Sequence, residues 1–263
     1  MKKLILLEFT KLKKFHALKY LFLAYMVVVP CWMLFMNWFF NLEPMIKQIF
    51  TKENLFDFPH VWSFTTYCAS FFNILLAVII VIITTNEIQY RTMRQNIIDG
   101  LTKQQVILSK FFSIIFLSVL ATSYTFLCAF VIGSISSGAS GFYENIHLNS
   151  LYFIQTLGYF SFAFLFALIV KRSAIAIVTF IVYFPFETIV GNLISKDLYQ
   201  FFPLKVYADL TPTPFFKGIL KMQEEATNQT IFVLDMNTKV ILALVYTTLC
   251  FFGTYLILKK RDL

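Results

Sequence analysis

The ionisable residue that stands out within an apolar stretch is Glu187, in the sequence Tyr183-Phe184-Pro185-Phe186-Glu187. A carboxylate in lipid is costly unless it faces water, a polar cavity or a partner. Pro185 would kink a helix and release a backbone carbonyl, which creates a polar spot beside Glu187. The pattern predicts a role for both residues in passing or gating a ligand. The alternative is a carboxylate that reaches the outer interface or bonds to a neighbouring helix.

Other residues able to do chemistry are scattered. Asn73 is a second candidate for a ligand path, although a lone asparagine in a membrane helix more often bridges helices. Three histidines lie at the edges of different apolar stretches: His16, His60 and His147. Four cysteines lie inside apolar stretches, without CxxC or Cys/His spacing: Cys31, Cys68, Cys128 and Cys250. This spacing predicts neither a metal site nor a disulfide framework.

The most informative polar segment is residues 87–103, which lies between two apolar stretches. Up to Gly100 the pattern predicts a short helix. Glu87 and Arg91 are four residues apart in the order that favours an ion pair. Gly100 is a natural helix stop, and Thr102 can cap the helix that follows.

The same segment contains a small apolar face, formed by Met93, Ile97 and Ile98. A short charged helix lying across the membrane surface would be a good docking site for a soluble partner. The alternative is a solvated loop that only orients the two flanking spans.

The apolar stretches must position these residues. The 263-residue chain is 59% hydrophobic and 14% charged, with a mean hydropathy of +0.73, which is more apolar surface than one soluble core can hide. About 20 apolar residues cross a bilayer as a helix. Six stretches qualify: Leu18–Phe40, Trp62–Thr85, Val106–Ile135, Leu151–Val170, Ala174–Ile194 and Val240–Leu258. We therefore expect an all-α integral membrane protein with six transmembrane helices in a single domain, residues 1–263.

The basic residues predict the orientation of the spans. Alternate connections hold six, four, two and three Lys or Arg, 15 in all, whereas the opposite connections hold seven in longer segments. By the positive-inside rule, the first set faces the cytoplasm. We expect a multi-pass protein of the cell (inner) membrane with both termini in the cytoplasm. The net charge of +8 reflects this topology and does not indicate a nucleic-acid partner.

Two segments outside the spans carry further expectations. Residues 1–17 place Leu4, Leu7 and Phe15 roughly on one helical face, which predicts an interfacial helix and not a cleaved signal peptide. The alternative is a basic leader that only orients the first span. Residues 195–238 alternate aromatics and prolines with charges, which predicts a structured extracytoplasmic cap.

Residues of the 87–103 segment and of both chain ends together resemble a known family. The segment contains Glu87, then Thr92 and Arg94, then Gly100, Thr102 and Lys103, and finally Lys110 inside the next span. The chain opens with Leu7-Glu8-Phe9-Thr10-Lys11-Leu12 and ends with Lys260-Arg261-Asp262-Leu263. With its six spans, the chain resembles the permease subunits of ABC-2-type exporters. It departs from them at Arg91, where many members have glycine.

The resemblance implies that residues 87–103 form a coupling helix that docks in a groove of an ATPase subunit. The implied coupling residues are Glu87, Arg91, Thr92, Arg94, Asp99, Gly100, Thr102 and Lys103. None of the 8 glycines is followed by Lys-Ser or Lys-Thr, so the chain has no Walker motif and we expect no enzyme activity of its own. ATP and Mg would be bound by two copies of a separate ATPase. A second permease copy, or a sister permease, would complete the path.

Two rival functions remain. An intramembrane enzyme should gather carboxylates or histidines on one membrane face, and the sequence shows no such cluster. A non-transporting anchor or sensor could use the same coupling helix without passing a substrate. The 33 phenylalanines suit an apolar or amphipathic cargo and lipid contact equally well, so they do not identify a substrate.

Overall fold

The computed structural model describes residues 16–42, 54–138, 140–211 and 234–260, and all regular structure within these ranges is helical. Six helices are long and apolar enough to cross a membrane. They are α2 (His16–Leu42), α4 (His60–Gln89), α6 (Lys103–Ser137), α7 (His147–Val170), α8 (Ser173–Leu193) and α12 (Met236–Lys260). The expected all-α, multi-pass membrane architecture is confirmed, and each predicted span falls on one of these helices to within one residue.

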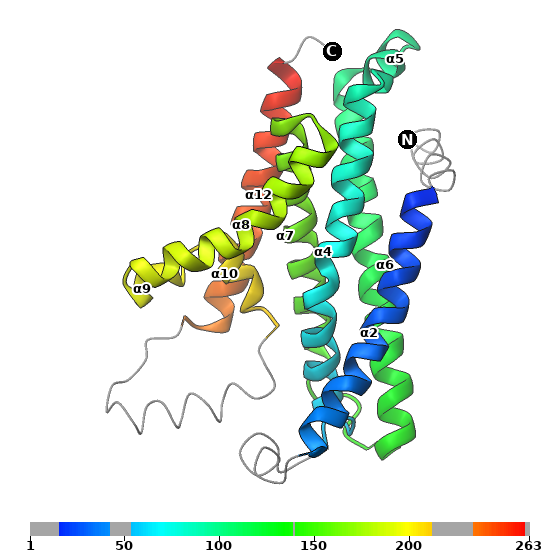
Figure 1. Ribbon diagram of the computed structural model, residues 1–263, viewed down its shortest axis with the longest axis vertical. Helices are drawn as coiled ribbons and strands as arrows, with labels where there is room; N and C mark the ends of the chain where they lie inside the picture. The colour runs from blue at the N-terminus through cyan, green and yellow to red at the C-terminus, as the bar shows by residue number, and fades with distance from the viewer. Residues whose placement is uncertain (1–15, 43–53, 139, 212–233, 261–263) are drawn as a thin grey trace.

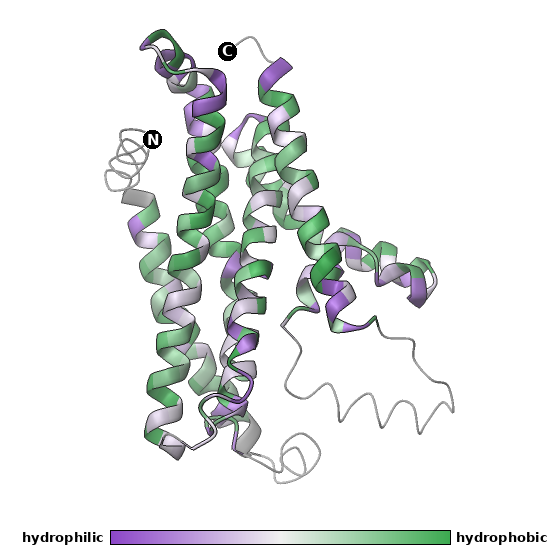
Figure 2. Cartoon of the chain, turned by 180° about the vertical axis from the view of Figure 1, so that it is seen from behind, coloured by the Kyte–Doolittle hydropathy of each residue, from purple (hydrophilic) through white to green (hydrophobic). Residues whose placement is uncertain are grey.

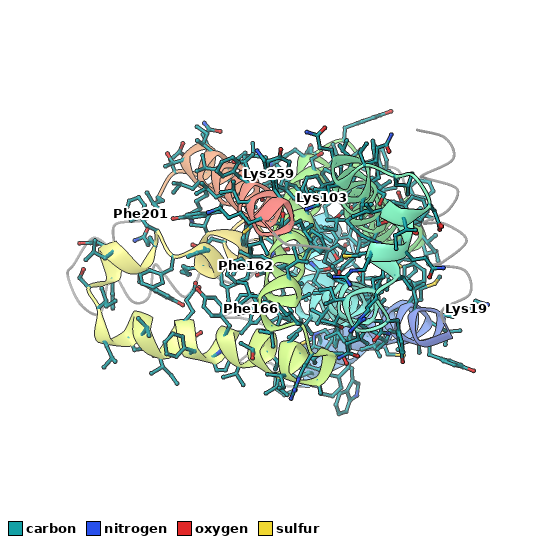
Figure 3. All side chains as sticks on the ribbon, turned by 90° about the horizontal axis from the view of Figure 1, so that it is seen from above. Lys19, Lys103, Phe162, Phe166, Phe201 and Lys259 are labelled. Carbon is teal, nitrogen blue, oxygen red and sulfur yellow. The ribbon has the colours of Figure 1, made fainter. Side chains whose placement is uncertain are left out.

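Helices α4 and α7 form the centre of the bundle. The two helices pack against each other along their length, and α7 also contacts α6, α8, α10 and α12. Figure 3 shows α7 between α8 and α12, with Phe162 and Phe166 directed toward the α8 side. The outer helices α2, α8 and α12 bury only a small share of their side chains inside the bundle. On α8 the exposed side chains are apolar, for example Val178, Phe186 and Ile189, as expected for a surface that faces lipid.

The described chain begins and ends at the same end of the bundle. Figure 1 shows the start of α2, the end of α12 and the short helix α5 (Thr92–Ile98) together there. Figure 2 shows hydrophilic residues concentrated on α5 and at the end of α12, with hydrophobic residues along the long helices. We call this end of the bundle the α5 end, and the other the far end.

Between α8 and α12 the chain forms two short helices, α9 (Lys196–Tyr199) and α10 (Pro203–Ala208). Helix α10 packs against α7 and α12, whereas α9 lies at the outer end of α8, away from the bundle. Both stop well short of the far end that α4 and α6 reach (Figure 1). Leu204, Tyr207 and Leu210 are buried against the bundle. Within the described residues of the expected cap, α10 is packed against the long helices and α9 is not, and the extracytoplasmic cap itself stays a prediction.

Several sequence expectations lie outside the described residues. The predicted interfacial helix falls almost entirely within residues 1–15, and the motif of residues 7–12 lies there too. Residues 212–233 of the predicted cap and residues 261–263 of the C-terminal motif are also outside. These expectations stay predictions.

Candidate functional site

The connection between α4 and α6 is a compact turn of helices. Helix α4 ends at Gln89, Arg91 adopts a left-handed conformation with φ 56°, and α5 begins at Thr92. Arg91 lies in the turn after α4 and not on the same helix as Glu87, whose carboxylate bonds to Lys110, so the expected i, i+4 pair between Glu87 and Arg91 is wrong. An αL residue at the start of α5 ends one helix and redirects the next.

The α5 helix ends as the sequence predicted. Gly100 has φ 98°, a conformation that favours glycine, and α6 begins two residues later. Thr102 Oγ1 accepts from the backbone N of Gln105 at 3.3 Å, and Gln105 Oε1 accepts from the backbone N of Thr102 at 3.0 Å. This reciprocal capping box fixes the start of α6.

A buried ion pair joins α4 to α6 directly above this turn. Lys110 Nζ donates to Glu87 Oε1 at 2.6 Å, and the two side chains are 4% and 9% exposed. Thr92 Oγ1 also donates to the backbone carbonyl of Glu87 at 3.4 Å, which ties the first residue of α5 to the end of α4. The sequence reasoning placed Lys110 in the family pattern but did not pair it with Glu87. A lysine inside an apolar stretch was the available signal.

One side of α5 packs and the other is exposed. Met93 is buried and Ile97 packs against the core, whereas Ile98 is 77% exposed, and Tyr90, in the turn before α5, is 75% exposed. Of the predicted coupling residues, five are exposed and Thr92 and Lys103 are half-buried, while Glu87 points inward. The exposed set is Arg91, Arg94, Asp99, Gly100 and Thr102. The expected apolar face is thus divided, with Met93 and Ile97 inside and Ile98 outside.

Replacing Gly100 by alanine tests the geometry of this turn. A Cβ on Gly100 would meet nothing within 4 Å, so the cost arises from the backbone conformation alone. We expect a loss of about 1–2 kcal/mol in the free energy of unfolding, measured by denaturation in detergent micelles. Wild-type stability in Gly100→Ala would contradict the left-handed turn.

A large cavity of about 1310 Å³ lies between α4, α7, α8 and the short helices α9 and α10. Residues from α4, α7, α8, α9 and α10, and from the start of α12, line it. Pro185, predicted as a path residue, is on its wall, whereas Asn73 and Glu187 are not among its lining residues. The cavity is large enough for a drug-sized or lipid-like molecule.

Asn73 takes part in a buried hydrogen-bond network between helices. Tyr152 donates to Asn73 Oδ1 at 2.7 Å, and Asn73 Nδ2 donates to Thr156 at 3.2 Å. The Tyr152 hydroxyl also lies 2.7 Å from that of Tyr25. These contacts join α2, α4 and α7. Asn73 therefore bridges helices, which is the more common role of a lone asparagine in a membrane helix.

Glu187 lies beside the first turn of α10. Its carboxylate is buried, and Oε1 accepts from the backbone N of Lys205 at 2.9 Å. Pro203 begins α10, so the first backbone N–H groups of this helix point toward the carboxylate without intrahelical partners. A carboxylate is stabilised at a helix N-terminus by these donors and by the helix dipole. The arrangement corresponds to the alternative in which Glu187 bonds to a neighbouring helix.

Charged residues on α10 and α12 form a second ion-pair cluster. Asp209 accepts from Lys205 at 2.7 Å and lies 3.1 Å from Lys239 of α12. All three side chains line the cavity. The i, i+4 spacing of Lys205 and Asp209 was the signal available in the sequence, but nothing in it pointed to Lys239.

Polar contacts also anchor α10 to α7 and α12. Gln155 Nε2 donates to the carbonyl of Tyr207 at 3.0 Å and to Thr211 Oγ1 at 2.9 Å, and the Tyr207 hydroxyl lies 3.0 Å from Thr247 Oγ1. Burial raises the pKa of the Tyr207 phenol above its ordinary value, although the hydrogen bond to Thr247 lowers it in part. The phenol is therefore a neutral hydrogen-bonding group that fixes α10 between two long helices.

The described residues bring together no group of three or more His, Cys, Asp or Glu side chains that could hold a metal ion. The polar side chains of the described residues form one buried ion pair, a partly exposed ion-pair cluster and interhelical hydrogen bonds, and some of them line the cavity.

A sequence model for the family described as "Protein of unknown function (DUF2705)" matches residues 21–263. A search among curated proteins found no match.

Proposed function

We propose that this chain, which belongs to the DUF2705 family of unknown function, is the membrane-spanning permease subunit of an ATP-driven ABC exporter. The observation that carries the proposal is the position and partial exposure of α5. This short helix lies at the end of the bundle where the described chain begins and ends. Thr92 ties it to α4, its Met93 is buried, and Ile98 is exposed, as is Tyr90 in the turn before α5. A rigid element with exposed apolar side chains is suited to binding a soluble partner.

The charge distribution supports a cytoplasmic position for the α5 end. Within the described ranges, nine of twelve Lys and Arg residues lie at this end: Lys19, Arg91, Arg94, Lys103, Lys110, Lys171, Arg172, Lys259 and Lys260. The other three, Lys196, Lys205 and Lys239, line the cavity. By the positive-inside rule, α5 and both termini face the cytoplasm of a cell membrane.

In this proposal the exposed residues of α5 dock on an ABC ATPase, which binds ATP and Mg. The inward-facing Glu87 and Lys110 hold α4 to α6, and Thr92 bonds α5 to the Glu87 carbonyl, so that movement of α5 is passed to the spans. Two permease copies, or this chain and a sister permease, pair with two ATPase copies. Helix α10 re-enters the membrane from the outer side, which lipid allows because its polar groups bond to α7, α8 and α12 and face a cavity.

A non-transporting anchor or sensor remains the second candidate, since it could use the same docking helix. The cavity favours transport. A structural anchor has no use for a space of about 1310 Å³ lined by polar and aromatic side chains between the helices. Pro185 and the re-entering helix α10, which Glu187 caps, are the elements we expect to move when the path opens.

The test is co-expression of the chain with the ABC ATPase encoded beside it, followed by purification in nanodiscs. We expect the two subunits to co-purify and to hydrolyse ATP. Arg94→Ala, which changes an exposed residue of α5, should weaken the complex, and Glu87→Ala should leave hydrolysis uncoupled from the permease. Lys19→Ala, at the same end but on α2, is the matched control. If no ATPase associates, the permease proposal fails.

A further inference from the structure

The cavity walls divide into a polar part and an apolar part. The polar part comes from α9, α10 and the start of α12, and it includes Lys196, Lys205, Asp209 and Lys239. The apolar part comes mainly from α4 and α8, and it includes the large side chains Tyr67, Phe71, Ile74, Phe180, Ile181 and Phe184. A ligand that fills both parts must be amphipathic.

The charge of the polar part is positive. Three lysines and one aspartate line the cavity, which gives a net charge of +2 with histidines neutral. Lys205 and Lys239 share the single carboxylate of Asp209. The nearby Glu187 carboxylate is already engaged at the N-terminus of α10. Asp209 balances only one of the two lysine charges, so this cluster keeps one excess positive charge.

Lys196 adds the second excess charge. It is exposed, lines the cavity and makes no hydrogen bond or ion pair with the other described residues. An excess of positive charge beside low-dielectric walls attracts anions strongly, because the apolar surroundings do not screen it as water does. Ammonium groups bind phosphate and carboxylate through short, charge-assisted hydrogen bonds.

We propose that this cavity binds an amphiphile with an anionic head, with the head at Lys196, Lys205 and Lys239 and the apolar chain against α4 and α8. The inference rests on the proposed function, for which it names the class of cargo. The same chemistry could come from an exported single-chain amphiphile or from an anionic phospholipid of the bilayer. The binding test needs no ATPase, so its outcome is independent of whether the permease proposal holds.

The experiment is native mass spectrometry of the full chain in a neutral maltoside detergent. The single-chain probes are dodecyl phosphate, dodecylphosphocholine and dodecyltrimethylammonium, which share one tail and differ in head charge. Phosphatidylglycerol and phosphatidylcholine form the second arm and report on bilayer lipid. In whichever arm shows binding, we expect the anionic probe to bind at least about tenfold more tightly than the zwitterionic one. The pairs compared are dodecyl phosphate with dodecylphosphocholine, and phosphatidylglycerol with phosphatidylcholine.

Variants localise the binding. Lys196→Gln and Lys239→Gln should each weaken binding of the anionic probe about tenfold, whereas Lys19→Gln, an exposed lysine at the α5 end, should not. Because the Lys196 side chain makes no hydrogen bond or ion pair with the other described residues, its variant separates lost binding from lost stability. Tight binding of dodecyl phosphate indicates a cargo site, and binding of phosphatidylglycerol alone indicates a lipid site of the same chemistry. Equal affinity for all heads, or equal effects of the three lysine variants, would overturn the proposal.

Discussion

Lys110→Ala is expected to lower the free energy of unfolding by about 3–5 kcal/mol, because it removes the cation that lies 2.6 Å from the buried Glu87 carboxylate. Removing one partner of a buried pair leaves a charge in surroundings that solvate it poorly. Glu87→Ala should cost a similar amount, since it leaves the Lys110 ammonium in the same position. Unfolding in mixed micelles with increasing SDS measures both.

The pair must be distinguished from a general effect of losing a lysine. Lys259→Ala, an exposed lysine at the same end of the bundle, should change stability by less than about 0.5 kcal/mol. The double variant Glu87→Gln, Lys110→Met removes both charges and should be more stable than either single alanine variant. If Lys110→Ala behaves like Lys259→Ala, the buried pair does not hold α4 to α6.

Gly158→Ala is expected to destabilise the protein by about 1–3 kcal/mol through overpacking. A Cβ on Gly158 of α7 would lie 2.1 Å from Cε1 of Tyr207, and Tyr207 is held on its other side by Thr247. Since the ring cannot move freely, the substitution should push α10 away from α7. The displacement would alter the cavity wall that Lys205 and Asp209 form.

Gly253→Ala provides the matched control, because its Cβ would meet only Leu165 at an ordinary distance of 3.6 Å. In a helix interior, glycine to alanine without a clash stabilises by up to about 1 kcal/mol. Thermal unfolding of the two variants should therefore shift in opposite directions. Adding Tyr207→Leu to Gly158→Ala should recover part of the loss. A shift of the same sign for both glycines would show that α7 and α10 do not pack closely at Gly158.

Features set by local sequence could be predicted well. The six apolar stretches predicted the long helices because each is long and apolar enough to span a bilayer on its own. Gly100 and Thr102 predicted the stop of α5 and the start of α6, since a left-handed turn and a capping hydroxyl act within a few residues.

Features that depend on tertiary packing could not be predicted. Glu87 was expected to pair with Arg91, four residues away, but its partner is Lys110, 23 residues away on another helix. The contact between Glu187 and the N-terminus of α10 spans 18 residues and requires α10 to fold back against α8. A sequence pattern of period 3.6 reports neighbours on one helix and gives no information on which helices meet.

The cavity was only partly accessible to sequence reasoning. Pro185 was recognised because a proline in an apolar stretch is unusual, and it lies on the cavity wall. Asn73 was recognised because a polar side chain in an apolar stretch is also unusual. Its amide, however, forms hydrogen bonds between helices. Lys205 and Lys239 entered the sequence analysis only in the count of basic residues between the spans, and their convergence on Asp209 depends on how α10 folds against α12.

The central claim, that α5 docks on an ABC ATPase in the cytoplasm, is tested most directly by site-specific photo-crosslinking in cells. Benzoylphenylalanine is placed at Ile98 of α5 and, as a control, at Tyr143, which is 83% exposed between α6 and α7 at the far end of the bundle. The account predicts that the ATPase crosslinks to position 98 and not to position 143. Crosslinking from position 143, or from neither position, would contradict it.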